Sequence, residues 1–203
     1  GILMPTAEYQ TLKIIFSIIL IQGGILLYWF ITSDNFIGML GFSAIAEMSL
    51  LSWFVAAVVV ACYIWGAASI SQVREHMFRF DKLKYAALTG ALVSGVFEEL
   101  VFRKLLMDYL LEVGFGTVSQ IILSGIAFGM AHLVWGKKAV SAGVNATFYT
   151  FFLGCGLALI YIVSERNLAL CIIAHTLVTA AIEPGLIKSA VLNKLGYFKE
   201  RTE

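Results

Sequence analysis

The sequence predicts an all-α protein, a polytopic membrane helical bundle of about six transmembrane helices with additional interfacial amphipathic helices. The chain has 203 residues, of which 60% are hydrophobic and only 13% are charged. A soluble domain of this size is roughly half apolar and a quarter charged. Its mean hydropathy is +0.90. No linker, internal repeat or second soluble domain interrupts the apolar pattern, so residues 1–203 are expected to form a single membrane-embedded domain.

Six apolar stretches are long enough to cross a bilayer as helices, which takes roughly 20 residues. They cover roughly 11–32, 44–67, 84–112, 117–135, 140–163 and 167–183. Two other segments, residues 71–84 and the tail after Pro184, mix apolar with basic residues. They are expected to lie along the membrane surface as amphipathic helices. His76, in the first of them, is expected to be solvated or to face lipid headgroups.

The placement of Lys and Arg predicts the orientation, because basic residues are enriched on the cytoplasmic side of membrane proteins. With six spans, most basic residues fall on one side: Lys13, Arg74, Arg79, Lys82, Lys84, Lys137, Lys138, Lys188, Lys194, Lys199 and Arg201. The other side has Arg103, Lys104 and Arg166. The protein is therefore expected to be a multi-pass protein of the cell membrane with both termini in the cytoplasm. Nothing in its charge indicates a nucleic-acid partner.

Two adjacent carboxylates, Glu98 and Glu99, lie inside the third apolar stretch. Ionisable groups at membrane depth are costly, and they usually face a cavity or a partner and mark function. Glu99 and Arg103 are four residues apart and can pair on one helix face, whereas Glu98 points about 100° away. Two carboxyl groups in unlike surroundings can serve different chemical roles. A buried ion pair that only fixes helix packing is the alternative interpretation.

Two histidines also fall in apolar stretches. His132 lies near the cytoplasmic end of the fourth span, and His175 lies close to the middle of the sixth. Thr179 follows one turn after His175 and can share its face. Each histidine alone is also explained by a position at the membrane interface or by a hydrogen bond between helices. Together with the glutamates, however, they supply general acids and bases and groups that bind an oxyanion or a zinc ion.

Other hydrolase patterns are missing. The sequence contains neither HExxH nor GxSxG, the motifs of zinc metalloproteases and of serine hydrolases with a nucleophile elbow. Asp34, Asp81 and Asp108 lie near span ends, so an aspartyl-type membrane protease is not supported. A transporter is disfavoured because an inverted repeat and paired broken helices are not evident.

The ordered motifs resemble those of the CPBP family, the CaaX-protease and bacteriocin-processing intramembrane endopeptidases that are also called Abi proteins. They are Glu98-Glu99-x-x-x-Arg103, Phe128-x-x-x-His132 and His175-x-x-x-Thr179. The resemblance covers roughly 90–183. The family's last motif usually ends in Asn or a related acidic or amide residue, so Thr179 is a departure.

This resemblance implies an intramembrane endopeptidase, of glutamate type or metallo-type, that cuts a membrane-associated peptide or protein. It implies that Glu98 activates a water molecule and that Glu99 and Arg103 orient Glu98. His132 and His175 would bind the oxyanion or, with Glu98, hold Zn²⁺. Thr179 would complete the site with one hydrogen bond. The alternative is a non-enzymatic membrane partner of the same fold that acts in bacteriocin immunity or in regulation of a sensor protein.

Overall fold

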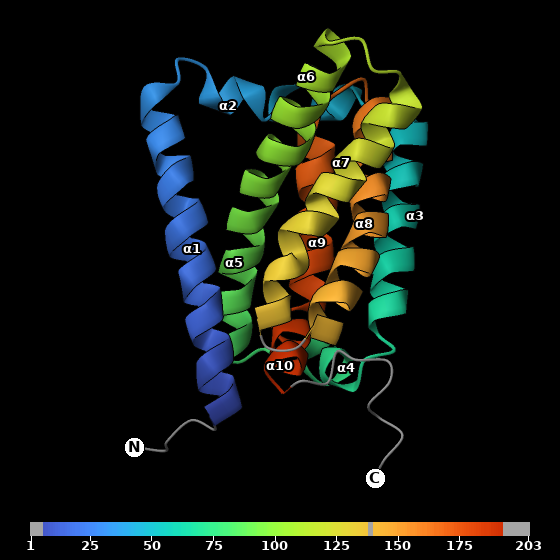
Figure 1. The fold of residues 1–203 in the computed structure, drawn as a ribbon. Coiled ribbons are helices and arrows are strands. Elements are labelled where there is room, and N and C mark those ends of the chain that lie inside the picture. Colours follow the sequence, from blue (N-terminus) through green and yellow to red (C-terminus); the bar gives the residue numbers. More distant parts are fainter. Residues whose placement is uncertain (1–5, 138–139, 193–203) are drawn as a thin grey trace.

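The computed structural model describes residues 6–137 and 140–192, and all the regular elements in that part of the chain are helices (Figure 1). Ten of them are α-helices, two are 3₁₀-helices (η1 and η3), and η2 is a π-helix. In chain order they are α1 (Thr6–Thr32), α2 (Phe36–Met39), η1 (Phe42–Glu47), α3 (Leu50–Ala67), α4 (Ser71–Met77), α5 (Lys82–Glu99), η2 (Leu100–Leu105), α6 (Leu106–Glu112), α7 (Thr117–Ala131), η3 (His132–Lys137), α8 (Val140–Val163), α9 (Leu168–Ile182) and α10 (Gly185–Val191).

The predicted membrane bundle is confirmed. Among the described residues, five helical stretches are long and apolar enough to cross a membrane, and there are six if α9 and α10, which meet at 56°, count as one broken span. The outer helices expose large apolar side chains, such as Leu20 and Ile31 on α1 and Phe54 on α3. In water such a surface would aggregate, but in a bilayer these side chains face lipid tails of the same polarity.

Helix α9 lies in the middle of the bundle. It contacts α3, α5 and α8, and Figure 1 shows it enclosed by neighbouring helices. It has 15 residues, which is about 22 Å of helix and less than the roughly 30 Å of a hydrocarbon core. Most of its residues are apolar and buried, as expected of a helix surrounded by protein. At its start, the Asn167 side chain accepts from the N–H of Ala169 and donates to the carbonyl of Gly41.

The second predicted span begins later than expected. Residues 42–47 form the separate 3₁₀-helix η1, and α3 begins only at Leu50. Met48 is extended, and the Ser49 side chain caps α3 by accepting the N–H of Ser52 at 3.1 Å. A predicted start near 44 was therefore wrong, because a serine cap rather than hydrophobicity sets where this helix begins.

The predicted amphipathic helix over 71–84 is also shorter than expected. It ends at Met77, and Asp81 caps the start of α5, so Lys82 and Lys84 belong to a membrane span. His76 is 1% exposed, which contradicts the expectation of a solvated side chain. Its Nε2 lies 3.1 Å from Nζ of Lys188 on α10. Packing of α4 against α10 buries it, a contact between segments more than a hundred residues apart in the chain.

Helices α4 and α10 lie at the same end of the bundle as the first turns of α1 and α5 (Figure 1). Lys84 also lies at this end, where its ammonium group donates to the backbone carbonyls of Ala180 and Glu183 and so holds the end of α9. The opposite end is formed by α2, η1 and α6. Lys138, Lys194, Lys199 and Arg201, which contributed to the predicted charge bias, lie outside the described residues.

Candidate active site

The two glutamates lie where the third span changes its helical geometry. Helix α5 ends at Glu99, and residues Leu100–Leu105 continue as the π-helix η2. At its end the N–H of Leu106 donates to the carbonyl of Val101, five residues back. Short π-helical turns are rare and occur frequently at functional sites. This wider turn immediately follows the pair of carboxylates and carries Arg103.

Glu99 and Arg103 form the predicted ion pair between residues four apart, with 2.9 Å between Arg103 Nε and Glu99 Oε2. Both side chains are fully buried. The two side chains attract each other by charge, because neither Arg103 Nε nor Glu99 Oε2 has a hydrogen-bond partner among the described residues. Arg103 Nη1 donates to the Ser124 hydroxyl at 3.0 Å, and its guanidinium carbon lies 4.9 Å from the centre of the Phe128 ring. The two opposite charges therefore compensate each other where water is excluded.

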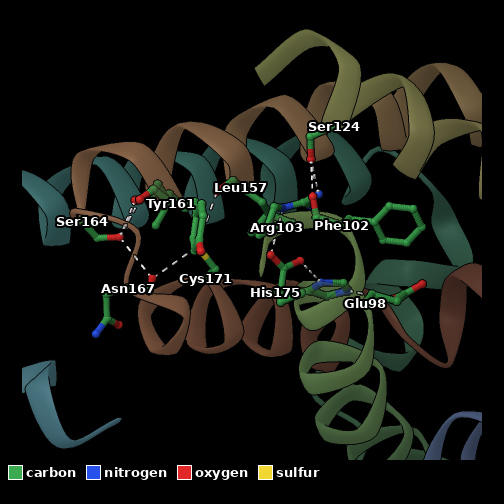
Figure 2. A network of polar contacts seen from close by, with 12 residues as sticks. Glu98, Phe102, Arg103, Ser124, Leu157, Tyr161, Ser164, Asn167, Cys171 and His175 are labelled. Carbon is green, nitrogen blue, oxygen red and sulfur yellow. Dashed lines mark hydrogen bonds and ion pairs between the residues drawn. The ribbon is translucent and has the colours of Figure 1, made fainter. Parts of the chain in front are cut away.

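His175 of α9 bridges the two carboxylates. Its Nδ1 lies 2.7 Å from Glu99 Oε1, and its Nε2 lies 3.2 Å from Glu98 Oε2. Figure 2 shows His175 and Glu98 pointing toward one another, with Arg103 on the other side of His175. A ring with a proton on each nitrogen donates to both carboxylates. In that state the charges of Glu98, Glu99, Arg103 and His175 cancel.

The two glutamates differ in their access to solvent. The Glu99 side chain is 0% exposed, whereas the Glu98 side chain is 15% exposed. Glu99 is enclosed between Arg103 and His175, and Glu98 contacts only the far nitrogen of the same imidazole in the contacts described. Glu98 is thus the carboxylate that a water molecule can reach, and Glu99 is the one that holds other groups in place.

His132, the residue directly after α7 and the first of η3, approaches the same place. Its Nδ1 lies 2.7 Å from the carbonyl oxygen of Phe128. A carbonyl only accepts, so Nδ1 carries the proton and Nε2 is the nitrogen left for other contacts. The Phe128 ring lies between the two histidines, with its centre 4.8 Å from the His132 ring and 5.7 Å from the His175 ring. Glu98, His132 and His175 therefore converge on one region, although they come from three different spans.

Thr179 lies one turn after His175 on α9 and is buried, at 8% exposure. Its backbone carbonyl accepts the N–H of Glu183 at 2.9 Å. Sequence reasoning missed Glu183, which continues the row of His175 and Thr179 at four-residue spacing. The backbone carbonyl of Glu183 accepts a hydrogen bond from the ammonium group of Lys84 at 2.8 Å. The sequence signal for Glu183 was its four-residue spacing from Thr179, which is itself four residues after His175.

Ser124 was missed as well. It is fully buried on α7, and it precedes Phe128 and His132 at the same four-residue spacing. Its hydroxyl accepts from Arg103 and donates to the backbone carbonyl of Phe102 at 2.7 Å. A buried polar residue on the same helix face as a candidate catalytic histidine could have indicated its position.

Zinc binding by Glu98, His132 and His175 was the alternative to oxyanion binding by the two histidines. Among residues 6–137 and 140–192, no group of three or more His, Cys, Asp or Glu side chains is spaced to hold a metal ion. Both nitrogens of His175 already face carboxylates. A zinc ligand needs a nitrogen lone pair directed at the metal, so Nε2 of His175 could bind Zn²⁺ beside Glu98 only in the tautomer that has its proton on Nδ1, facing Glu99.

A helical membrane bundle that buries two glutamates, an arginine and a histidine in one contact network, with a second histidine beside it, defines a class of membrane protein with a candidate hydrolytic site. Comparison with known families matches residues 80–181 to the type II CAAX prenyl endopeptidase Rce1-like family. The chain belongs to this family, and membership implies an intramembrane protease. No curated protein and no solved structure matches the chain.

Proposed function

We propose that this protein is an intramembrane endopeptidase in which Glu98 activates a water molecule to cut a peptide bond of a membrane-associated protein or peptide. The observation that carries the proposal is the His175 bridge, which holds Glu98 through one nitrogen and Glu99 through the other. It leaves Glu98 partly exposed and encloses Glu99. A general base must be positioned by other groups and must still reach its water.

The reaction follows from these positions. Glu98 removes a proton from water while the water oxygen bonds to the carbonyl carbon of the scissile peptide. The carbonyl oxygen becomes an oxyanion in a tetrahedral intermediate. This intermediate collapses by breaking the carbon–nitrogen bond, and the leaving nitrogen receives the proton that Glu98 had taken. The products are a carboxylic acid and an amine, and Glu98 is again a carboxylate. His175 keeps this carboxylate aimed through its Nε2–H.

His132 is the residue proposed to stabilise the oxyanion. Its Nδ1–H is used by the carbonyl of Phe128, so donation from Nε2 requires a ring with protons on both nitrogens. In that form the ring is a cation that also attracts the developing negative charge. Donors aimed at an oxyanion in a water-poor site contribute strongly to catalysis. Thr179 is proposed to add one hydrogen bond on the same side as His175.

The test uses purified protein in liposomes and two quenched-fluorescent peptides. Because the family name specifies a CAAX prenyl endopeptidase, one probe ends in a CAAX sequence with a prenylated cysteine and the other has the same sequence without the prenyl group. Glu98→Gln keeps the size of the side chain but removes the base. We expect a loss of at least roughly 10²–10⁴-fold in turnover with a nearly unchanged melting temperature.

The alternative of a non-enzymatic partner, in bacteriocin immunity or sensor regulation, is favoured by one feature, Thr179 in the position where the family usually has Asn or a related residue. The same assay separates the two functions. A wild-type protein that cuts neither probe, or a Glu98→Gln variant that cuts as fast as the wild type, contradicts the proposed peptidase mechanism.

A further inference from the structure

Ser124 and Phe128 on α7 and His132, the residue directly after that helix, form a row at four-residue spacing, and each member contacts a different part of the site. His132 lies at the end of the row beside Phe128. Phe128 contacts both histidines and the guanidinium of Arg103. Ser124 binds Arg103 directly. Ser124 is also the member of the row to which the proposed mechanism assigns no role.

The contacts of Ser124 determine the direction of its hydroxyl group. Its one O–H donates to the carbonyl oxygen of Phe102 at 2.7 Å, so its lone pairs remain for Arg103 Nη1 at 3.0 Å. Figure 2 shows Ser124 directly above Arg103 and Phe102. Phe102 and Arg103 both belong to η2. A serine on α7 therefore binds the π-helical turn at two adjacent residues.

This contact sets the orientation of Arg103. Among the described residues, Nε and Nη2 of Arg103 have no hydrogen-bond partner, and the attraction to Glu99 is an ion pair without hydrogen-bond alignment. The bond to Ser124 is thus the directional contact of the guanidinium. Because the guanidinium is a rigid plane, fixing Nη1 also fixes where Nε points.

From Arg103 an unbroken series of contacts leads to the proposed base. Arg103 Nε lies 2.9 Å from Glu99, Glu99 lies 2.7 Å from His175 Nδ1, and His175 Nε2 lies 3.2 Å from Glu98. We infer that Ser124 is a positioning residue, which orients Arg103 and through Glu99 and His175 aims the carboxylate of Glu98. This inference rests on the proposed function of Glu98, but the orientation of His175 can be measured without any activity.

Ser52 provides a matched control. It is also a buried serine, and its hydroxyl donates to a backbone carbonyl of another helix, that of Val163, at 2.8 Å. It connects α3 to the end of α8, and its hydrogen bonds within the described part of the chain are to Ser49 and Val163, outside the site. Replacing either serine by alanine removes a buried hydroxyl and an interhelical hydrogen bond. Only Ser124→Ala also removes the hydrogen bond that Arg103 makes.

The experiment compares Ser124→Ala, Ser124→Thr and Ser52→Ala in lipid nanodiscs by two measurements. The first is the ¹⁵N spectrum of the imidazoles, which is tractable because the chain has three histidines. The second is cleavage of the two CAAX peptides. We expect Ser124→Ala to shift the His175 signals and to lower kcat by roughly 10- to 100-fold, because small displacements of a reacting group are costly. KM should change little. Ser124→Thr retains the hydroxyl, so its His175 signals and its kcat should be close to those of the wild type.

Ser52→Ala should lower the melting temperature about as much as Ser124→Ala but should leave kcat and the His175 signals unchanged. If Ser124→Ala is merely less stable, with wild-type kcat and wild-type His175 signals, the inference is wrong and the bond only packs helices. If Ser124→Ala shifts the His175 signals while the wild-type protein cuts neither peptide, the orienting contacts are supported and the proposed function fails instead.

Discussion

At the scale of single residues, the site depends on two adjacent carboxylates with unequal surroundings. One helix turn carries both, but a buried arginine and one side of an imidazole enclose Glu99, whereas Glu98 faces the other side of that imidazole and is partly exposed. Environments of this kind assign different roles to chemically identical groups. Because the proposed roles of base and support fall on different residues, Glu98 and Glu99, different substitutions can test them.

Removing either partner of the buried pair should lower stability as well as activity. Glu99→Gln leaves the charge of Arg103 uncompensated, and Arg103→Ala leaves that of Glu99. Breaking a buried pair in this way costs roughly 3–5 kcal/mol. The measurement is thermal or denaturant unfolding beside the peptide cleavage rate, with Glu98→Gln as the variant that should lose activity alone.

Lys104→Ala is the control for these variants. Lys104 and Asp108 also form an ion pair four residues apart, at 3.1 Å, but both side chains are 35% exposed. An exposed pair contributes only about 0.2–1 kcal/mol, so this change should be nearly neutral. A Glu99→Gln protein that is as stable as the wild type but inactive, beside a Glu98→Gln protein that cuts normally, would reverse the two assigned roles.

At the scale of helices, close contact of α7 with α8 holds His132 in place. Gly129 lies three residues before His132, and a Cβ atom there would be 2.8 Å from the carbonyl oxygen of Thr147 and 3.3 Å from Cβ of Phe151. Backbone oxygens do not yield as the end of a flexible side chain does. Only glycine therefore allows the two helices to approach this closely.

Gly129→Ala should separate α7 from α8, displace His132 and lower both the melting temperature and the cleavage rate. Overpacking of this kind costs roughly 1–3 kcal/mol. Gly24→Ala on α1 is the matched control, because a Cβ at that position meets nothing within 4 Å and alanine favours the helix. Finding Gly129→Ala at least as stable as Gly24→Ala would show that the packing of α7 against α8 does not require glycine at this position.

At the scale of the whole molecule, the end that contains α4, α10 and the start of α5 is expected to face the cytoplasm, because basic residues collect there. Helix α7 runs toward this end (Figure 1), and His132 follows its last residue. Substrate should therefore reach the site from the cytoplasmic side. The link between α6 and α7 lies at the opposite end and should be extracytoplasmic.

Cysteine labelling tests this orientation in a background in which the three native cysteines are replaced. Phe80, between α4 and α5, and Phe115, between α6 and α7, are both exposed and lie at opposite ends of the bundle. A membrane-impermeant maleimide added to intact cells should label Phe115→Cys and not Phe80→Cys, and both should react once the cells are opened. The reverse pattern would invert the proposed topology.

The sequence alone predicted the membrane bundle, the positions of most spans and the ion pair at the centre of the candidate site. The stretch 140–163 coincides with α8, and Glu99 and Arg103 form the ion pair that their spacing predicts. These features depend on hydrophobic length and on helical periodicity, which act between residues close in the chain. For the same reason they could be predicted without knowing which helices are neighbours.

The tertiary structure alone decided how those residues face one another. His175 binds glutamates 76 and 77 positions away in the chain, Ser124 binds an arginine 21 positions away, and His76 is buried by a lysine 112 positions away. Contacts at such separations depend on which helices pack together, and that is set by close glycine contacts and buried polar bonds rather than by any local pattern. The direction in which Glu98 points is therefore a property of the assembled bundle.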